Sequence, residues 1–251
     1  MRAVTPKSRL DSLLVDRGLV DSRGKAQALI LAGQVLVAEQ KVEKCGARVE
    51  ADAPVRLLGE PPKFVSRAGL KLEGALEYFR VDPNGRICLD IGASTGGFTD
   101  CLLQRGAVKV FAVDVGTNQL DWKLRRDTRV VALEKTNARH LTIEPIGERV
   151  ALATMDVSFI SANLILPALP PLLDPAADVL VLVKPQFEVG RGQVGKGGVV
   201  RDSRLQQEAV AKVARKLLEL GFRDIASTES CLPGASGNRE FFLHAIWEKP
   251  A

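Results

Sequence analysis

Apolar residues at the start of the chain recur three and four positions apart in two stretches and then alternate in short runs. Residues 10–14 form the first helical pattern, which stops at Gly18, a residue that suits a helix C-terminus. Asp21 and Ser22 can cap a second helix, which Gly33 closes. Strand-like runs follow at positions 35–37, 42 and 55–58. The pattern therefore predicts a small α+β domain over residues 1–60.

Both periodicities break at Gly59, Pro61 and Pro62, as an exposed domain boundary would. We therefore assign residues 61–70 to an interdomain linker. A second domain is predicted over residues 71–251, beginning with a helix whose apolar side runs to Phe79.

Short apolar runs and helical segments alternate through this second domain. Strands are predicted at residues 87–90, 110–114, 129–134, 150–155, 178–183, 222–226 and 240–247, with a long helix over 203–220. Such alternation is typical of an α/β fold with a doubly wound, Rossmann-like sheet, here of seven strands. In such sheets ligands bind at the carboxyl ends of the strands.

The composition indicates a soluble, globular protein. Of 251 residues, 46% are hydrophobic and 26% are charged, and the mean hydropathy is +0.05. The apolar run at 179–183 is too short to cross a bilayer, and residues 1–8 lack the apolar core of a signal peptide. The cysteines are scattered without a C-x-x-C pair, which is typical of buried thiols in a reducing compartment. We therefore expect a cytoplasmic protein without a membrane partner.

The same scattering bears on metal chemistry. The two histidines, His140 and His244, lie far in sequence from any cysteine. We therefore expect no metal site and no Ser-His-Asp chemistry.

Positive charge is concentrated toward the N-terminus. Residues 1–71 contain 13 Lys and Arg against 8 Asp and Glu, a net +5, whereas residues 72–251 contain 22 against 22. A local excess of this kind favours a polyanionic partner. The alternative is that these side chains only form a solvated face of a small domain.

The turn after the first strand of the second domain carries the clearest ligand signal. Its order is Asp90-x-Gly92-x-x-x-Gly96-Gly97, which differs from the G-x-G-x-x-G of a pyrophosphate loop. Its glycines would let the backbone approach a ligand, and Asp90 would meet an ammonium group directly or through water. Asp114, 24 residues further on, has the spacing of a carboxylate that holds ribose hydroxyls. A Gly-rich turn without a ligand is the alternative.

This loop resembles the S-adenosylmethionine (SAM) loop of Rossmann-like methyltransferases, whose ligand has an amino-acid end and no phosphate. The resemblance implies SAM as the cofactor. Asn137 follows the third strand, close to where an adenine would lie, and Asp156 ends the fourth strand. The cofactor-binding residues that we expect are Asp90, Gly92, Ser94, Gly96, Gly97, Phe98, Asp114, Asn137 and Asp156.

The N-terminal domain resembles the S-four RNA-binding domain. The resemblance covers residues 8–58 and rests on the order of four features. These are Arg9-Leu-Asp-x-Leu-Leu, Arg17-Gly18-Leu, Ser22-Arg23 and the apolar positions around Gly33. That family binds structured RNA through basic residues at the second helix and adjoining loops, which here implies Arg9, Arg23, Lys25 and Lys41. The linker adds Lys63 and Arg67 as expected RNA contacts. A protein-interaction module is the alternative.

Four charged residues of the second domain match, in order, the Lys-Asp-Lys-Glu tetrad of FtsJ-like ribose 2′-O-methyltransferases: Lys71, Asp156, Lys184 and Glu240. The chain further resembles the TlyA family in segments 93–98, 156–161, 183–189 and 232–238. That family is haemolysin-like in name and similar to rRNA (cytidine-2′-O)-methyltransferases. The resemblance implies methyl transfer from SAM to a cytidine ribose hydroxyl of ribosomal RNA, free or in a subunit. Lys184 is then the base or the group that positions the oxygen.

One motif departs from that family. Its interdomain R-x-W-V-x-R appears here as Pro62-Lys-Phe64-Val-Ser-Arg67, which concerns cofactor-coupled switching rather than chemistry. Two other functions are weighed. A catalytically silent RNA-binding or ribosome-assembly factor would leave the SAM loop and the tetrad without a purpose. A cytolysin would need a membrane-spanning segment that the sequence lacks.

Overall fold

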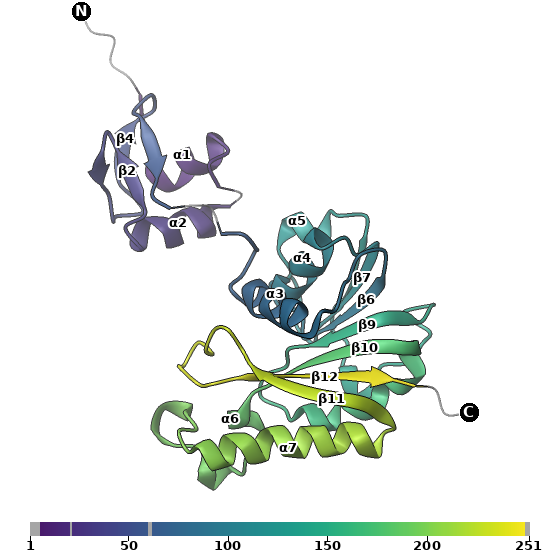
Figure 1. Ribbon diagram of the computed structural model, residues 1–251. Helices are drawn as coiled ribbons and strands as arrows, with labels where there is room; N and C mark the ends of the chain where they lie inside the picture. The colour runs from purple at the N-terminus through teal and green to yellow at the C-terminus, as the bar shows by residue number, and fades with distance from the viewer. Residues whose placement is uncertain (1–5, 21, 60–61, 249–251) are drawn as a thin grey trace, which may run out of the picture. The chain divides into compact units, whose positions relative to one another are not determined.

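The computed structural model describes residues 6–20, 22–59 and 62–248, and the chain forms two compact units, Met1–Pro61 and Pro62–Ala251 (Figure 1). The helix cap predicted at Asp21 lies outside the described residues, as do residues 1–5 of the segment considered for a signal peptide. In the part of the chain that is described, no helix is long and apolar enough to cross a membrane.

The smaller unit builds its own core from two helices and two small antiparallel sheets. Its elements in chain order are β1 (Lys7–Arg9), α1 (Leu10–Asp16), α2 (Arg23–Leu31), β2 (Val35–Val37), β3 (Gln40–Lys41), β4 (Arg48–Glu50) and β5 (Val55–Leu57). β1 pairs with β4, and β2 lies between β3 and β5. Leu10 and Leu14 of α1 are fully buried against Ala26 and Ile30 of α2, as their helical spacing predicts.

Local signals explain where α2 begins but not every strand. The Ser22 Oγ accepts a hydrogen bond from the Lys25 amide (3.3 Å), so Ser22 caps α2. The pair of β1 and β4 was not predicted. Each has only three residues, too few to establish an alternating pattern in the sequence.

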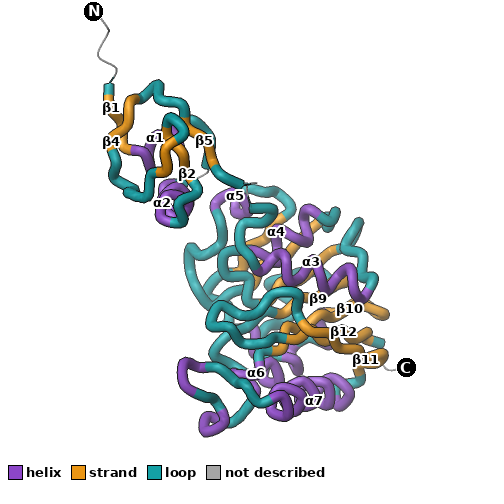
Figure 2. Tube along the Cα trace, turned by 60° about the vertical axis from the view of Figure 1, so that its left-hand side comes forward, coloured by secondary structure: helices purple, strands orange, loops and turns teal. Residues whose placement is uncertain are grey.

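The larger unit contains a seven-stranded sheet in the order β11-β12-β10-β9-β6-β7-β8. Figure 2 shows the neighbouring strands β9, β10, β12 and β11. Its strands are β6 (Ile87–Ile91), β7 (Lys109–Val113), β8 (Val130–Leu133), β9 (Val150–Met155), β10 (Leu173–Val183), β11 (Phe222–Glu229) and β12 (Phe241–Trp247). β12 runs antiparallel to both of its neighbours, and the strands from β8 to β10 are parallel. The predicted Rossmann-like sheet is confirmed, with one reversed strand that the alternation did not reveal.

Helices cover both faces of the sheet, as a doubly wound fold requires (Figure 1). One face carries α3 (Ala68–Phe79), α4 (Gly97–Gln104) and α5 (Trp122–Arg125), and the other carries α6 (Pro185–Glu188) and α7 (Ser203–Glu219). Neighbouring strand residues alternate between the two cores: Cys88 joins Leu72 of α3, whereas Leu89 joins Val213 of α7. The carboxyl ends of the strands therefore stand on a platform that is packed from both sides.

The crossover between β9 and β10 has no α-helix. The chain instead makes three 3-10 turns, Ala162–Leu164, Leu166–Ala168 and Pro170–Leu172. Prolines at 167, 170 and 171 lack the backbone N–H that a longer helix needs. β10 consequently begins at Leu173, earlier than the predicted position 178.

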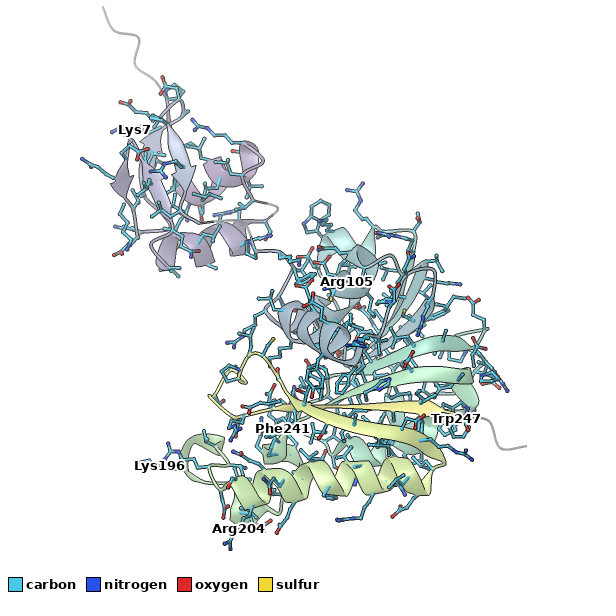
Figure 3. All side chains as sticks on the ribbon, in the orientation of Figure 1. Lys7, Arg105, Lys196, Arg204, Phe241 and Trp247 are labelled. Atoms are coloured by element: carbon cyan, nitrogen blue, oxygen red, sulfur yellow. The ribbon has the colours of Figure 1, made fainter. Side chains whose placement is uncertain are left out.

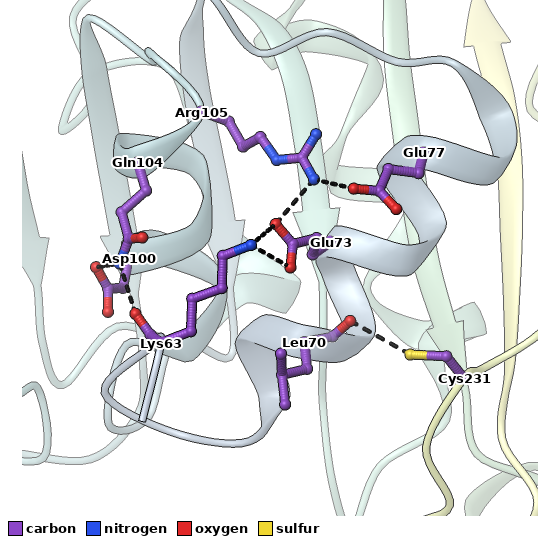
Figure 4. Close-up of polar contacts among 8 residues, drawn as sticks. All are labelled: Lys63, Leu70, Glu73, Glu77, Asp100, Gln104, Arg105 and Cys231. Carbon is purple, nitrogen blue, oxygen red and sulfur yellow. Dashed lines mark hydrogen bonds and ion pairs between the residues drawn. The ribbon is translucent and has the colours of Figure 1, made fainter. Parts of the chain in front are cut away.

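The segment predicted as an interdomain linker, residues 61–70, is mostly built into the larger unit. Phe64 is only 3% exposed. The Asp100 carboxylate of α4 accepts a hydrogen bond from the Val65 amide (2.8 Å), and Gln104 Nε2 donates to the Lys63 carbonyl oxygen (2.9 Å; Figure 4). α3 already begins at Ala68. The linker prediction is corrected accordingly. Residues 63–65 are held in place by contacts with α4, a helix more than 30 positions further along the chain.

Candidate active site

Two cavities open where the parallel strands end. The large cavity, about 380 Å³, has in its lining Gly92, Ser94, Asp114, Asn137 and Asp156. The small cavity, about 190 Å³, is lined in part by Gly97, Phe98, Ser158 and Lys184. The two share Gly92, Ser94, Asp156 and Ser158, so they are neighbours. Seven of the nine predicted cofactor residues, all except Asp90 and Gly96, thus meet the predicted catalytic lysine at one edge of the sheet.

Asp114, at the end of β7, fixes the Gly-rich loop while facing the large cavity. Its Oδ2 accepts a hydrogen bond from the Ser94 amide (2.8 Å), and its Oδ1 accepts one from the Gly116 amide (2.7 Å). Each carboxylate oxygen has lone pairs to spare for a further donor. Asn137 caps a short 3-10 turn through its Oδ1, which accepts from the Arg139 amide (3.1 Å).

Asp90 does not take the place that the sequence predicts. It is fully buried, and its carboxylate accepts hydrogen bonds from the Thr99 hydroxyl (2.6 Å) and the Thr154 hydroxyl (3.2 Å). Burial raises the pKa of Asp90 to about 7, although the hydrogen bond from Thr99 opposes the rise. The expectation of a direct contact with a ligand's ammonium group is therefore corrected: Asp90 ties β6 to α4 and β9.

The loop glycines make close contacts within the chain. A Cβ on Gly92, which has φ +82°, would lie 2.3 Å from the Asp156 carbonyl oxygen. A Cβ on Gly96 would lie 2.3 Å from a Leu124 methyl carbon, and one on Gly97 would lie 2.2 Å from Ser66 Oγ. Sequence spacing located these glycines correctly, but their partners come from distant segments.

The four predicted catalytic residues form two ion pairs. Lys71 Nζ of α3 lies 2.6 Å from Glu240 Oε2, and the two side chains are 8% and 3% exposed. Lys184 Nζ lies 2.6 Å from Asp156 Oδ1, and these side chains are 12% and 17% exposed. The first pair is buried, whereas the second lines the small cavity. Only the second pair is therefore placed to meet a substrate in that cavity.

Ser158, which sequence reasoning missed, also holds Lys184. Lys184 Nζ donates a hydrogen bond to Ser158 Oγ (2.8 Å). Ser158 lies two residues after Asp156 in the same loop, within the segment 156–161 that carries part of the family resemblance, and these were the signals available in the sequence. The amine of Lys184 is thus held between two side chains of one loop.

Glu188 of α6 is a second residue that the sequence analysis passed over. Its carboxylate accepts hydrogen bonds from the Ser161 hydroxyl (2.5 Å) and the Ala162 amide (2.7 Å), which pins the far end of the loop that carries Asp156 and Ser158. Burial raises the pKa of Glu188, against the hydrogen bond from Ser161. Because α6 directly follows Lys184, the loop and the lysine are fixed relative to each other.

Known families match both units. The model of the FtsJ-like methyltransferase family matches residues 64–246, and the model of the S4 domain matches residues 8–55. The 16S/23S rRNA (cytidine-2′-O)-methyltransferase TlyA of Mycobacterium tuberculosis is 50% identical over 238 residues, which cover 94% of this chain and 89% of that protein. The chain belongs to the TlyA family of FtsJ-like methyltransferases.

One further relative and one solved structure are also similar to this chain. Hemolysin A of Brachyspira hyodysenteriae is 43% identical over 239 residues, which cover 95% of this chain and 99% of that protein. The solved structure of the 1,6-didemethyltoxoflavin-N1-methyltransferase of Burkholderia thailandensis has a TM-score of 0.52 at 19% identity and covers 73% of this chain and 80% of that one. This last likeness shows the fold alone.

In the S4 domain of this TlyA-family chain, a buried acid organises two of the predicted RNA-binding residues. Arg9 donates to Asp11 through Nε (3.0 Å) and an amino group (2.9 Å), and Arg23 donates to the same carboxylate (3.1 Å). These hydrogen bonds from Arg9, with one from Gln27, hold the pKa of Asp11 well below its usual range. Both arginine side chains stay about half exposed. Lys41 pairs with Glu43 (3.2 Å).

The two basic residues assigned to the linker belong to the FtsJ-like domain. Lys63 Nζ donates to both carboxylate oxygens of Glu73 (2.6 and 2.8 Å), a group that Arg105 also contacts (2.8 Å; Figure 4). Arg67 donates to the Pro233 carbonyl oxygen (2.8 Å). Both residues therefore hold their own domain together, in addition to any contact with RNA.

The close approach at Gly92 predicts a large effect of one added methyl group. Gly92→Ala combines left-handed strain of about 1–2 kcal/mol with a backbone overlap, whereas Gly147→Ala adds the strain at φ +77° with nothing within 4 Å of the new Cβ. We expect Gly92→Ala to lower the Tm at least about twice as far as Gly147→Ala, because overpacking adds about 1–3 kcal/mol. Thermal unfolding of both variants measures this, and equal shifts would contradict it.

Burial of Asp90 predicts a pH-dependent stability. A carboxyl whose pKa is about 7 in the folded state and about 4 when unfolded binds more protons when folded, so its contribution falls as pH rises between those values. The difference in free energy of unfolding between Asp90→Asn and the wild type should therefore shift in favour of the variant from pH 5 to 7, by up to about 1.4 kcal/mol per pH unit. Thermal unfolding at several pH values tests this.

Asp127→Asn is the matched control. Hydrogen bonds from the Arg129 guanidinium (3.0 and 2.7 Å) hold the pKa of Asp127 below its usual value, and arginine stays charged at these pH values. The contribution of Asp127 is therefore complete above the unfolded pKa of about 4 and is lost only below it. The Asp127→Asn difference should be flat between pH 5 and 7, and a flat curve for Asp90→Asn as well would refute the prediction for Asp90.

Proposed function

We propose that this chain is a SAM-dependent ribosomal RNA methyltransferase that methylates the 2′-hydroxyl of a cytidine ribose. The observation that carries the proposal is the Lys184–Asp156 ion pair at the wall shared by two neighbouring cavities. A methyl donor and a ribose need two such adjoining spaces with a proton-handling group between them. The curated activity of the Mycobacterium tuberculosis relative supports the substrate class.

The large cavity fits SAM in size and in chemistry. Its volume of about 380 Å³ falls within the range of about 300–1,000 Å³ that is usual for small-molecule sites. Asp114 offers carboxylate oxygens to ribose hydroxyls, and Asn137 offers an amide on the adenine side. When bound, SAM supplies a methyl group on a positively charged sulfur. Gly92 and Ser94, with Asp156, form the boundary toward the small cavity, where we place the target ribose.

Lys184 is assigned the contact with the target hydroxyl. A ribose hydroxyl is a poor nucleophile at neutral pH, so its proton must be taken up or its developing charge stabilised. Asp156 and Ser158 hold Lys184 Nζ from two sides at the small cavity. An ammonium group has three N–H donors, so it retains one that can stabilise the charge developing on the ribose oxygen. Asp156 and Ser158 therefore act by positioning, and Lys184 acts on the reacting atom.

Lys71 and Glu240 have a supporting role in this proposal. Their ion pair joins α3 to the residue before β12 inside the protein. Removing one partner of such a buried pair leaves an unpaired charge and costs about 3–5 kcal/mol. Changes at Lys71 or Glu240 would therefore alter folding as well as catalysis, which makes Lys184 the better probe.

The S4 domain is proposed to bind the RNA. Its basic residues Arg9, Arg23, Lys25 and Lys41 are the expected phosphate contacts. Asp11 preorganises the first two, since it holds both guanidinium groups at one carboxylate while leaving them half exposed. Fewer rotamers are then lost when a phosphate binds.

The catalytic assignment predicts a selective loss of rate. Lys184→Ala should lower methyl transfer by roughly a hundredfold or more, while SAM binding and RNA binding stay near the wild-type values, because the contact with the reacting oxygen matters mainly in the transition state. Transfer of tritium from labelled SAM to ribosomal RNA, with calorimetry and thermal unfolding, measures all of these quantities.

Lys109→Ala is the control for Lys184→Ala. Lys109 also pairs with an acid at 2.6 Å, Glu148, but it lies at the start of β7. We expect this variant to keep its activity. A stable Lys184→Ala protein with nearly full activity would overturn the catalytic role, whereas loss of SAM binding and Tm in proportion to activity would reduce Lys184 to a structural residue.

The RNA assignment predicts a change in salt dependence. The double variant Arg9→Gln/Arg23→Gln should bind ribosomal RNA more weakly, with a salt slope smaller by about 0.7–0.9 per lost phosphate contact. Arg56→Gln is the control, because Arg56 pairs with Glu39 in the same domain (2.6 Å). Filter binding at several salt concentrations gives both slopes. Equal slopes for the double variant and the wild type would move the interface elsewhere.

A further inference from the structure

A basic segment of the larger unit lies beside the candidate active site. Residues 190–204, here called the basic loop, contain four basic residues, Arg191, Lys196, Arg201 and Arg204, against one acid, Asp202, whereas residues 72–251 together balance 22 against 22. Lys196, Arg201 and Arg204 are exposed. Within the described residues, none of these three forms an ion pair. Most other cations described above are held by acids of the same chain.

Two anchors hold the basic loop at the edge of the sheet where the cavities open. Its first end follows Lys184 through α6. Near its other end, Asn238 accepts a hydrogen bond from the Val200 amide (2.9 Å) and donates to the Gly198 carbonyl oxygen (2.9 Å). Asn238 is buried and lies two residues before Glu240. The basic loop is thus held near Lys184 at one end and near Glu240 at the other.

The reversed direction of β12 explains why both anchors share an edge. β10 ends at Val183 and β12 begins at Phe241, and these two residues are paired in the antiparallel ladder. Figure 3 accordingly shows Lys196 and Arg204 at the end of the domain where Phe241 lies, away from Trp247. The three exposed cations therefore belong to the same side of the sheet as Lys184.

Three of the five glycines of the basic loop differ from those of the loop at 92–97. A Cβ on Gly192, Gly197 or Gly198 would meet nothing within 4 Å, so packing within the chain does not require glycine there. Gly197 and Gly198 have φ of +77° and +78°. Successive glycines without a side chain allow a phosphate to approach the backbone closely.

We propose that the basic loop is a second RNA-binding surface, which holds backbone phosphates of the substrate strand next to Lys184. This inference rests on the proposed function. Unpaired cations and open glycines suit a phosphodiester backbone, and residues 190–204 contain no aromatic side chain on which a base would stack. The surface therefore contributes affinity and the register of the strand rather than choice of base.

The test is a triple variant of the full chain, Lys196→Gln/Arg201→Gln/Arg204→Gln. We expect affinity for ribosomal RNA to fall about tenfold or more near physiological salt, with a salt slope smaller by about 1.4 to 2.7 for two to three lost phosphate contacts. The kcat/KM for methyl transfer should fall with it, while the Tm and calorimetric SAM binding stay unchanged.

A second triple variant, Arg149→Gln/Arg215→Gln/Arg223→Gln, removes the same number of charges elsewhere. Arg149 precedes β9, and Arg223 is paired with Ile246 near the opposite end of β12, so both lie at the other edge of the sheet. Arg215 is exposed further along α7. This variant should keep RNA affinity close to the wild-type value, and equal losses in the two variants would overturn the proposal.

Two further outcomes separate the possibilities. Wild-type protein that neither binds nor methylates ribosomal RNA would overturn the proposed function and this inference together. If the wild-type protein methylates ribosomal RNA and the basic-loop variant has the same RNA affinity and kcat/KM as the wild type, this inference alone is overturned. A variant that binds free RNA normally but fails on assembled ribosomal subunits would assign the surface to a ribosomal protein and refute its role in RNA binding.

Discussion

The close contact between the ends of β6 and β9 is the constraint on which the rest of the site depends. The Asp156 amide donates to the Ile91 carbonyl oxygen (2.9 Å), and the Gly92 backbone approaches Asp156 so closely that a Cβ would lie 2.3 Å from its carbonyl oxygen. This contact sets the Gly-rich loop and the Asp156 loop against each other. Beneath it, Asp90 joins Thr99 and Thr154 and so ties the same strands to α4. The two cavities take their shared wall from this junction.

Charged groups serve two purposes in this protein, and their partners tell them apart. Where an acid holds the cation, as Asp156 holds Lys184 and Asp11 holds two arginines, the side chain is kept in one place. Such placement matters for contact with a single reacting oxygen or a single phosphate. Where no acid pairs with the cation, as for Lys196, Arg201 and Arg204 within the described residues, the side chain remains available to a polyanion. This difference in pairing is what supports the proposed binding surface.

Contacts across the larger unit also explain why residues 63–67 are ordered beside the site. Asp100 and Gln104 of α4 hold the backbone at Lys63 and Val65, and Ser66 lies against Gly97. The small cavity has Ser66 and Ala68 in its lining. The segment that connects the two units in the sequence therefore also forms part of the wall of the small cavity.

The sequence alone determined most of the regular elements and most of the residues of the site. Apolar spacing predicts both helices of the S4 domain and the seven strands of the sheet, because each element repeats its burial pattern over enough residues to be recognised. The order of Lys71, Asp156, Lys184 and Glu240 and the spacing of the Gly-rich loop locate the site at the carboxyl ends of the strands, since the fold places ligands there.

Only the tertiary structure decided which of these residues pair and which face a cavity. Gly92 needs its conformation because of Asp156, 64 positions further along, and Asp90 is enclosed by two threonines rather than by a ligand. The pairing of Lys71 with Glu240 and the anchoring of the basic loop by Asn238 likewise join residues far apart in the chain. Local patterns report periodicity and backbone preference, whereas burial and pairing depend on segments that meet only after folding.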